Sequence, residues 1–153
     1  MAWSVSKVRQ LFTDDPVRLK AALGKPDIDA QARVVVAEIR AHIPVGADWS
    51  DPNTWADVAI DMGVNNVFVL DEKHEDTGIY DWIKRNIYIN PNTDDDGICR
   101  RIVHELAHDV QAHRRVGRIR EGEERYDDNR QRVQHLVACR VVTMLLGERK
   151  PML

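Results

Sequence analysis

The apolar positions of this chain follow helical spacing at first. They predict helices over residues 3–23 and 29–42, and a third from Ser50 or Asp51 to Gly63. Proline stands at the first position of the third helix, where its missing N–H costs nothing. The first part of the chain is therefore expected to be helical.

The period then changes from helical spacing to short apolar runs. Val67–Leu70, Gly78–Trp82 and Ile87–Ile89 are rich in β-branched and aromatic residues, which predicts three short strands. Residues 71–77 form a polar turn between the first two, and Lys84-Arg85-Asn86 suits a tight hairpin between the last two. We expect a small antiparallel sheet of about three strands.

Two further helices follow the sheet. After the loop 91–97, which contains three consecutive aspartates able to cap a helix, one apolar residue recurs every four positions: Ile98, Ile102, Leu106 and Val110. The final helix runs from about Asn129 to Leu146 and ends at Gly147. Helices, a small sheet and two more helices predict one α+β domain over residues 1–153.

Residues 104–108 read His-Glu-Leu-Ala-His, an H-E-x-x-H motif. Each helical residue turns about 100°, so residues four apart lie on the same face of a helix. His104 and His108 therefore project from one face and can bind one Zn²⁺. Glu105 sits beside that face, where a carboxylate can take a proton from a metal-activated water. The motif predicts His104 and His108 as zinc ligands and Glu105 as general base.

A catalytic zinc usually has three protein ligands and a water, so a third ligand is needed. The extended motif H-E-x-x-H-x-x-G-x-x-H is excluded, because Gln111 and Arg114 stand where it requires Gly and His. The final helix offers His135, the polar member of a stripe of apolar or small residues: Ala138, Cys139, Val142 and Leu146. Because burying an unpaired histidine is costly, we favour His135 as the third ligand.

The charged segment 114–130 supplies the alternative third ligands: Glu121, Glu123 and Glu124. They would give the His₂Glu set found in proteases, but no apolar face fixes their positions. The segment is either a solvated connector or a rim of a substrate groove. His113 lies about 140° around the helix from His108 and points away from the metal, and it is a candidate oxyanion stabiliser with Tyr126.

Composition excludes several function classes. The net charge of −3 argues against general nucleic-acid or anionic-membrane binding. No apolar run is long enough to span a membrane and residues 1–5 lack a signal core, so we expect a cytoplasmic protein. Cys99 and Cys139 both fall in apolar helical patterns, which predicts two buried free thiols.

Residues 78–80 and 86–90 read G-I-Y and N-I-Y-I-N, and they precede I-V-H-E-L-A-H at 102–108. This order resembles the ImmA/IrrE family of zinc metallopeptidases, in which a short hairpin precedes a helix bearing H-E-L-G-H. Upstream, W-A at 55–56 and M-G-V at 62–64 resemble that family's helix–Gly–strand opening. The resemblance implies a zincin-like fold and a zinc cofactor.

The resemblance covers roughly residues 50–147, and residues 1–45 form a helical N-terminal extension outside it. The family's last helix carries a glutamate ligand where this chain has His135, and Ala107 replaces the family's usual glycine. A neutral imidazole in place of a carboxylate leaves the site one charge more positive. Bound water should then be more acidic, and the preferred metal changes.

We therefore expect a zinc metallo-endopeptidase that hydrolyses a protein or peptide substrate. The resemblance implies that this substrate is a helix-turn-helix repressor. The alternative is a non-catalytic zinc-binding module that binds a partner through residues 1–45 or 114–130. Glu105 favours the enzyme, because a structural zinc site closes with four protein ligands and has no use for a base. A nucleic-acid-binding accessory is disfavoured by the acidic net charge and the lack of a basic helix.

Overall fold

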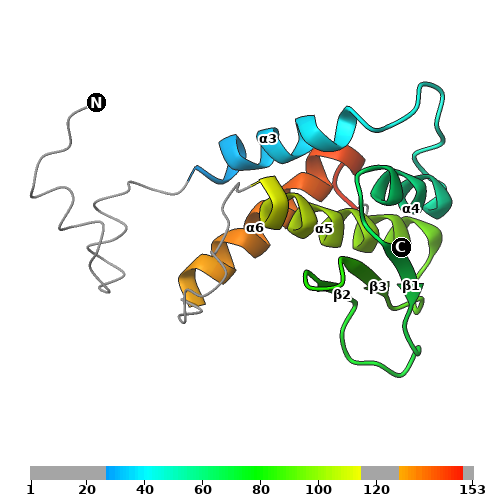
Figure 1. Ribbon diagram of the computed structural model, residues 1–153. Helices are drawn as coiled ribbons and strands as arrows, with labels where there is room; N and C mark the ends of the chain where they lie inside the picture. Colours follow the sequence, from blue (N-terminus) through cyan, green and yellow to red (C-terminus); the bar gives the residue numbers. More distant parts are fainter. Residues whose placement is uncertain (1–26, 115–127, 150–153) are drawn as a thin grey trace, which may run out of the picture.

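The computed structural model describes residues 27–114 and 128–149, which form four helices and one three-stranded sheet, an α+β arrangement (Figure 1). In chain order the elements are α3 (Ile28–Arg40), α4 (Pro52–Asp61), β1 (Asn66–Val69), β2 (Gly78–Asp81), β3 (Asn86–Ile89), α5 (Asp95–Arg114) and α6 (Asp128–Leu146). The helix predicted over residues 3–23 lies outside the described residues. Among the described helices, none has the length and apolar character needed to cross a membrane.

Helices α3 and α4 lie close to their predicted bounds, because aspartates cap them. Asp27 accepts a hydrogen bond from the backbone N–H of Ala30, and Asp51 accepts one from Asn53, each at 2.9 Å. These bonds satisfy N–H groups that the first turn of a helix leaves without partners. Gly63 follows α4 at φ 104°, a conformation that glycine adopts without strain.

The two final helices are fixed to one another at one end. Helix α5 begins after Asp94, which accepts a hydrogen bond from the N–H of Gly97 at 2.8 Å. Helix α6 ends before Gly147, which has φ 74°. Arg100 of α5 donates to the carbonyls of Gly147 (2.8 Å) and Leu146 (3.2 Å), groups that a helix end leaves unpaired. This contact helps to hold α6 in register against the motif helix.

The sheet is mixed, so the prediction of an antiparallel sheet was wrong. Its strand order is β1-β3-β2, with β3 antiparallel to β2 but parallel to β1. Strand β3 is central because its residues Ile87 and Ile89 are both buried, at 0% and 3% exposure. Strand β2 ends at Asp81, one residue before the predicted Trp82, and β3 begins at Asn86.

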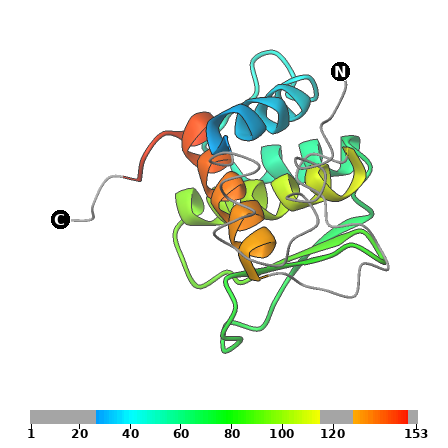
Figure 2. The same cartoon turned by 90° about the vertical axis from the view of Figure 1, so that its left-hand side faces the viewer.

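Helix α5 lies between the sheet on one side and helices α3 and α6 on the other (Figures 1 and 2). Its fully buried apolar residues include Val103, Leu106, Ala107 and Val110. Leu106 and Ala107 belong to the motif and the two valines flank it, so the helix that carries the candidate ligands is also at the centre of the core.

A buried ion pair joins α5 to the β2–β3 hairpin. Asp109, 1% exposed, accepts two hydrogen bonds from the guanidinium of Arg85, at 2.8 and 3.1 Å, and one from the hydroxyl of Tyr80 at 2.5 Å. Arg85 has φ 55° in the hairpin turn, and its guanidinium lies where a side chain at Gly63 would otherwise fit. Removing one partner of such a pair leaves a buried charge without compensation, so this network fixes the hairpin against the motif helix.

Only one of the two cysteines is buried, which corrects the prediction of two buried thiols. Cys99 lies in the core, whereas Cys139 is exposed. Helix α6 buries two residues of its predicted stripe, Ala138 and Val142, together with Val137, Val141 and Leu145. The buried face is centred to one side of the stripe, so Cys139 and His135 are exposed and lie at its margin.

Candidate metal centre

Helix α5 brings the two motif histidines together. The Nε2 atoms of His104 and His108 are 3.2 Å apart, and their ring centroids are separated by 4.8 Å. Two nitrogens bound to one tetrahedral zinc at 2.0–2.1 Å would be about 3.3 Å apart. The spacing of the two imidazoles therefore fits a shared metal ion.

Gln111 orients His108. Its side-chain Nε2 donates to the carbonyl of Gln134 in α6 at 3.1 Å, and its Oε1 lies 2.8 Å from Nδ1 of His108. An amide oxygen only accepts, so Nδ1 of His108 carries the proton and Nε2 keeps its lone pair toward His104. Such an outer partner fixes the tautomer of a metal-binding histidine.

His135 of α6 lies beside the pair. The centroids of the His135 and His104 rings are 5.0 Å apart, and a positive charge on His135 would lower the pKa of both motif histidines. The predicted third ligand is thus adjacent to His104, although it is exposed and does not lie on the buried face expected from its stripe. The coordination itself stays a prediction.

Cys139 is a member of the cluster that the sequence interpretation missed. Its Sγ lies 3.5 Å from Nε2 of His135 and 3.9 Å from Nδ1 of His104. Single ligand atoms of these three residues all lie within 4.8 Å of one another, and His108 is not a member of this group. Cys139 follows His135 by one helical turn, the spacing that made the motif histidines stand out, and this spacing was the available signal.

The protonation states suit a metal site. Burial, and then the nearby His108 and His135, lower the pKa of His104 to about 3. Burial also lowers the pKa of His108, against a raising contribution from its bond to Gln111. Both imidazoles are therefore neutral at pH 7 and offer lone pairs, as metal binding requires. Imidazole nitrogens with a thiol sulfur form a donor set that fits zinc.

Glu105 is held against the edge of the sheet. It is 8% exposed, and a Cβ placed at Gly78 of β2 would come within 3.0 Å of its Oε1. A larger residue at this position would force the Glu105 side chain to shift by a few tenths of an ångström. Burial, with a smaller contribution from the charge of Asp76, raises the pKa of Glu105 to about 7. This carboxyl group can therefore both take up and release a proton near neutral pH.

The raised pKa of Glu105 predicts a pH dependence of stability. In metal-free protein, protonated Glu105 stabilises the fold fully below its ordinary pKa of 4.5, and this contribution is lost as the pH rises through about 7. The loss amounts to about 3 kcal/mol. His104 and His108 titrate in the opposite sense, so the measurement is the difference in unfolding free energy between wild type and Glu105→Gln, from urea melts at pH 4 to 8. A difference that does not change with pH would contradict the assigned environment of Glu105.

Some residues that the sequence predicted for the site are not placed with the histidine cluster in the part of the chain that the structure describes. His113 is exposed, and its Nε2 lies 3.7 Å from Oδ1 of Asp109, the carboxylate that also binds Arg85. The alternative ligands Glu121, Glu123 and Glu124 and the candidate oxyanion stabiliser Tyr126 lie outside the described residues. The choice between them and His135 stays open.

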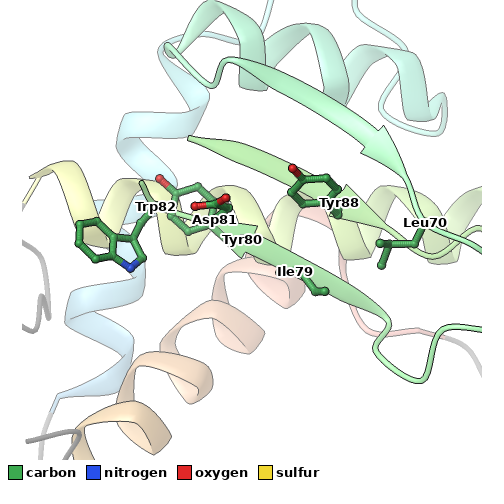
Figure 3. A pocket seen from close by; sticks show the side chains of 6 residues that line it. All are labelled: Leu70, Ile79, Tyr80, Asp81, Trp82 and Tyr88. Carbon is green, nitrogen blue, oxygen red and sulfur yellow. The ribbon is translucent and has the colours of Figure 1, made fainter. Parts of the chain in front are cut away.

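A pocket of about 520 Å³ lies over the sheet (Figure 3). It is lined by Leu70, Ile79, Tyr80, Asp81, Trp82 and Tyr88. Ile79 and Tyr88 are register partners on neighbouring strands, and the ring of Phe68 stacks on Tyr88 with centroids 5.4 Å apart. No lining residue belongs to the histidine cluster, so the pocket is an apolar and aromatic surface separate from the candidate ligands.

Comparisons of the chain with protein-family models, with curated proteins and with solved structures find no match. The interpretation of the centre therefore depends on its own geometry. The resemblance to the ImmA/IrrE family stays a prediction from the sequence.

Proposed function

We propose that this protein is a zinc metallo-endopeptidase with a zincin-like fold. His104, His108 and His135 hold the metal, and Glu105 is the general base. One observation carries the proposal: two imidazole nitrogens 3.2 Å apart on one helix turn adjoin a buried carboxyl group whose pKa is about 7. A site that only stabilises a fold needs no group of this kind.

In the proposed reaction, the bound metal ion and the protein side chains have different roles. When bound, Zn²⁺ lowers the pKa of water and polarises the scissile carbonyl. Glu105 takes the proton from the attacking water and passes it to the leaving amine. The charge of the bound ion would lower the pKa of Glu105 below its metal-free value, which keeps the carboxylate ionised and able to accept the proton. Gln111 keeps His108 in the tautomer that presents Nε2 to the metal.

The edge strand β2 is the proposed substrate platform. It pairs on one side with β3 in the described sheet, and its Gly78 lies against Glu105. An extended peptide can add to such an edge through backbone hydrogen bonds, and that would place its backbone beside the base. Substrate side chains would then meet the pocket that Ile79 and Trp82 help to line. A protein substrate, cut within an extended segment, fits this arrangement.

The family resemblance adds a more specific proposal. It suggests a cytoplasmic enzyme whose substrate is a separate helix-turn-helix repressor. The order of the hairpin and the motif helix, present here as β2–β3 followed by α5, supports it.

A non-catalytic zinc module is the second candidate, and Cys139 favours it. Three histidines and one thiolate would supply four protein ligands, which is the usual number for a structural zinc site. Such a site leaves no position for water, so it would bind zinc without hydrolysing peptides.

The test is zinc-dependent cleavage of an unfolded protein such as casein. The enzyme proposal expects cleavage by zinc-loaded protein, loss of cleavage after chelation and recovery on adding zinc back. Stable zinc binding with no cleavage of casein or of helix-turn-helix repressors would instead support the non-catalytic module.

A further inference from the structure

Strand β2 presents two side chains on the face of the sheet opposite α5. Successive side chains of a strand point to opposite faces, and Gly78 and Tyr80 both adjoin side chains of α5. Ile79 and Asp81 therefore project from the other, outer face, where both line the pocket (Figure 3). Because β2 is an edge strand of the described sheet, a chain added beside it would extend this outer face.

One row of residues across the outer face is apolar and aromatic. Phe68, Tyr88 and Ile79 are register partners on β1, β3 and β2, and the rings of Phe68 and Tyr88 stack with centroids 5.4 Å apart. The row reaches the β2 edge at Ile79. A residue directly opposite Ile79 on an added strand would have its Cβ about 4.5–5.5 Å away. An apolar or aromatic side chain fits this position, because aromatic and β-branched side chains pair favourably across strands.

The next row on the same face is polar and ends in a carboxylate. Its members are the register partners Asn66, Asn86 and Asp81. The β1 end of this row is thus a neutral amide, whereas the β2 end carries a negative charge. Oδ1 of Asp81 accepts hydrogen bonds from the N–H groups of Ile83 and Lys84 at 3.0 and 3.2 Å. These bonds fix the carboxylate at the β2 edge, where it attracts a cation.

Trp82 adds to the preference for a cation. It follows Asp81, is exposed and lines the same pocket. The face of an indole ring attracts ammonium and guanidinium groups. Two residues of an extended chain span about 6.6–6.8 Å, so a residue two positions from the one opposite Ile79 would lie opposite Asp81.

We infer that β2 selects extended substrate segments in which an apolar or aromatic residue and a basic residue stand two positions apart. Their side chains lie on the outer face beside Ile79 and Asp81. The residue between them turns its side chain toward the α5 face, where Glu105 adjoins Gly78. The inference rests on the proposed function, because it assigns this segment to the substrate, but the binding itself requires neither metal nor hydrolysis.

Binding of a labelled peptide to metal-free protein tests the inference. The probe is fluorescein-labelled Thr-Lys-Thr-Phe-Thr-Lys-Thr, which has a lysine two positions from its phenylalanine on either side and therefore suits both strand directions. Fluorescence anisotropy measures its Kd. Replacing the phenylalanine by serine should weaken binding about tenfold, because the apolar contact with the pocket is lost.

Asp81→Asn should weaken binding of the lysine peptide about two- to fivefold, as expected for an exposed ion pair. It should not change the binding of a peptide with threonine at both lysine positions. The asparagine oxygen can still accept from the hairpin N–H groups, so the turn is kept. The control Asp48→Asn makes the same change in the loop before α4, where Oδ1 accepts from the N–H of Ser50 at 2.9 Å, and should bind as wild type does.

The outcomes separate this inference from the proposed function. Binding that depends on the phenylalanine and on Asp81 supports the inference, and if casein is then not cleaved, the proposed function alone fails. Equal binding of the lysine and threonine peptides, or no measurable binding of either, overturns the inference even if zinc-loaded protein cleaves casein. Sedimentation velocity covers another occupant, because a dimer that the peptide does not dissociate would place a second copy of the chain on the edge and also overturn the inference.

Discussion

Glu105→Gln is expected to keep zinc and lose hydrolysis. The amide has nearly the same shape as the carboxyl group, so its packing against Gly78 is preserved. It cannot accept a proton from water, and removal of a general base costs about 10²–10⁴-fold in rate. The measurement is kcat for casein cleavage together with the zinc content of both proteins.

The matched control is Glu72→Gln, which makes the same chemical change at an exposed position in the β1–β2 loop. Its kcat should equal that of wild type. A Glu105→Gln protein that binds zinc and cleaves as fast as wild type would show that another group is the base.

His135→Ala should weaken zinc binding strongly. Loss of an outer partner of a metal ligand already costs about 10–100-fold in affinity, and loss of a ligand should cost more. His135→Glu should retain the metal, because a carboxylate oxygen reaches zinc at a similar distance. Competition with a zinc chelator measures the affinity of each variant.

His113→Ala is the control, since His113 lies on the same motif helix beside Asp109 and away from the cluster. Zinc should also raise the melting temperature of wild type more than that of His135→Ala, because binding stabilises the folded state by mass action. Unchanged affinity in His135→Ala would exclude this ligand and favour the segment that carries Glu121, Glu123 and Glu124.

The sequence predicted the helices well because their ends carry strong local signals. Asp51, Asp94 and Gly147 act where capping chemistry requires them, and the four-residue apolar repeat of the motif helix is the buried face of α5. The sheet topology was not predictable in the same way. Alternation identifies a strand but does not say which strand is central, and the central strand is β3, whose Ile87 and Ile89 are buried.

Some features of the candidate site could be predicted from the sequence, and others could not. The H-E-x-x-H spacing placed His104 and His108 on one face, since helix geometry alone decides this. The orienting bond of Gln111 to His108 and the proximity of Cys139 to His104 depend on how α6 packs against α5. The raised pKa of Glu105 depends on its burial against β2, a strand far from it in sequence. Contacts between elements are not encoded in a local pattern.

The most direct test of the metal centre is the zinc content of purified wild-type protein, measured by elemental analysis after zinc loading and removal of excess metal. The account predicts about one Zn²⁺ per chain, and none in a His104→Ala, His108→Ala double variant that still folds. Wild-type protein that retains no zinc after loading would contradict it.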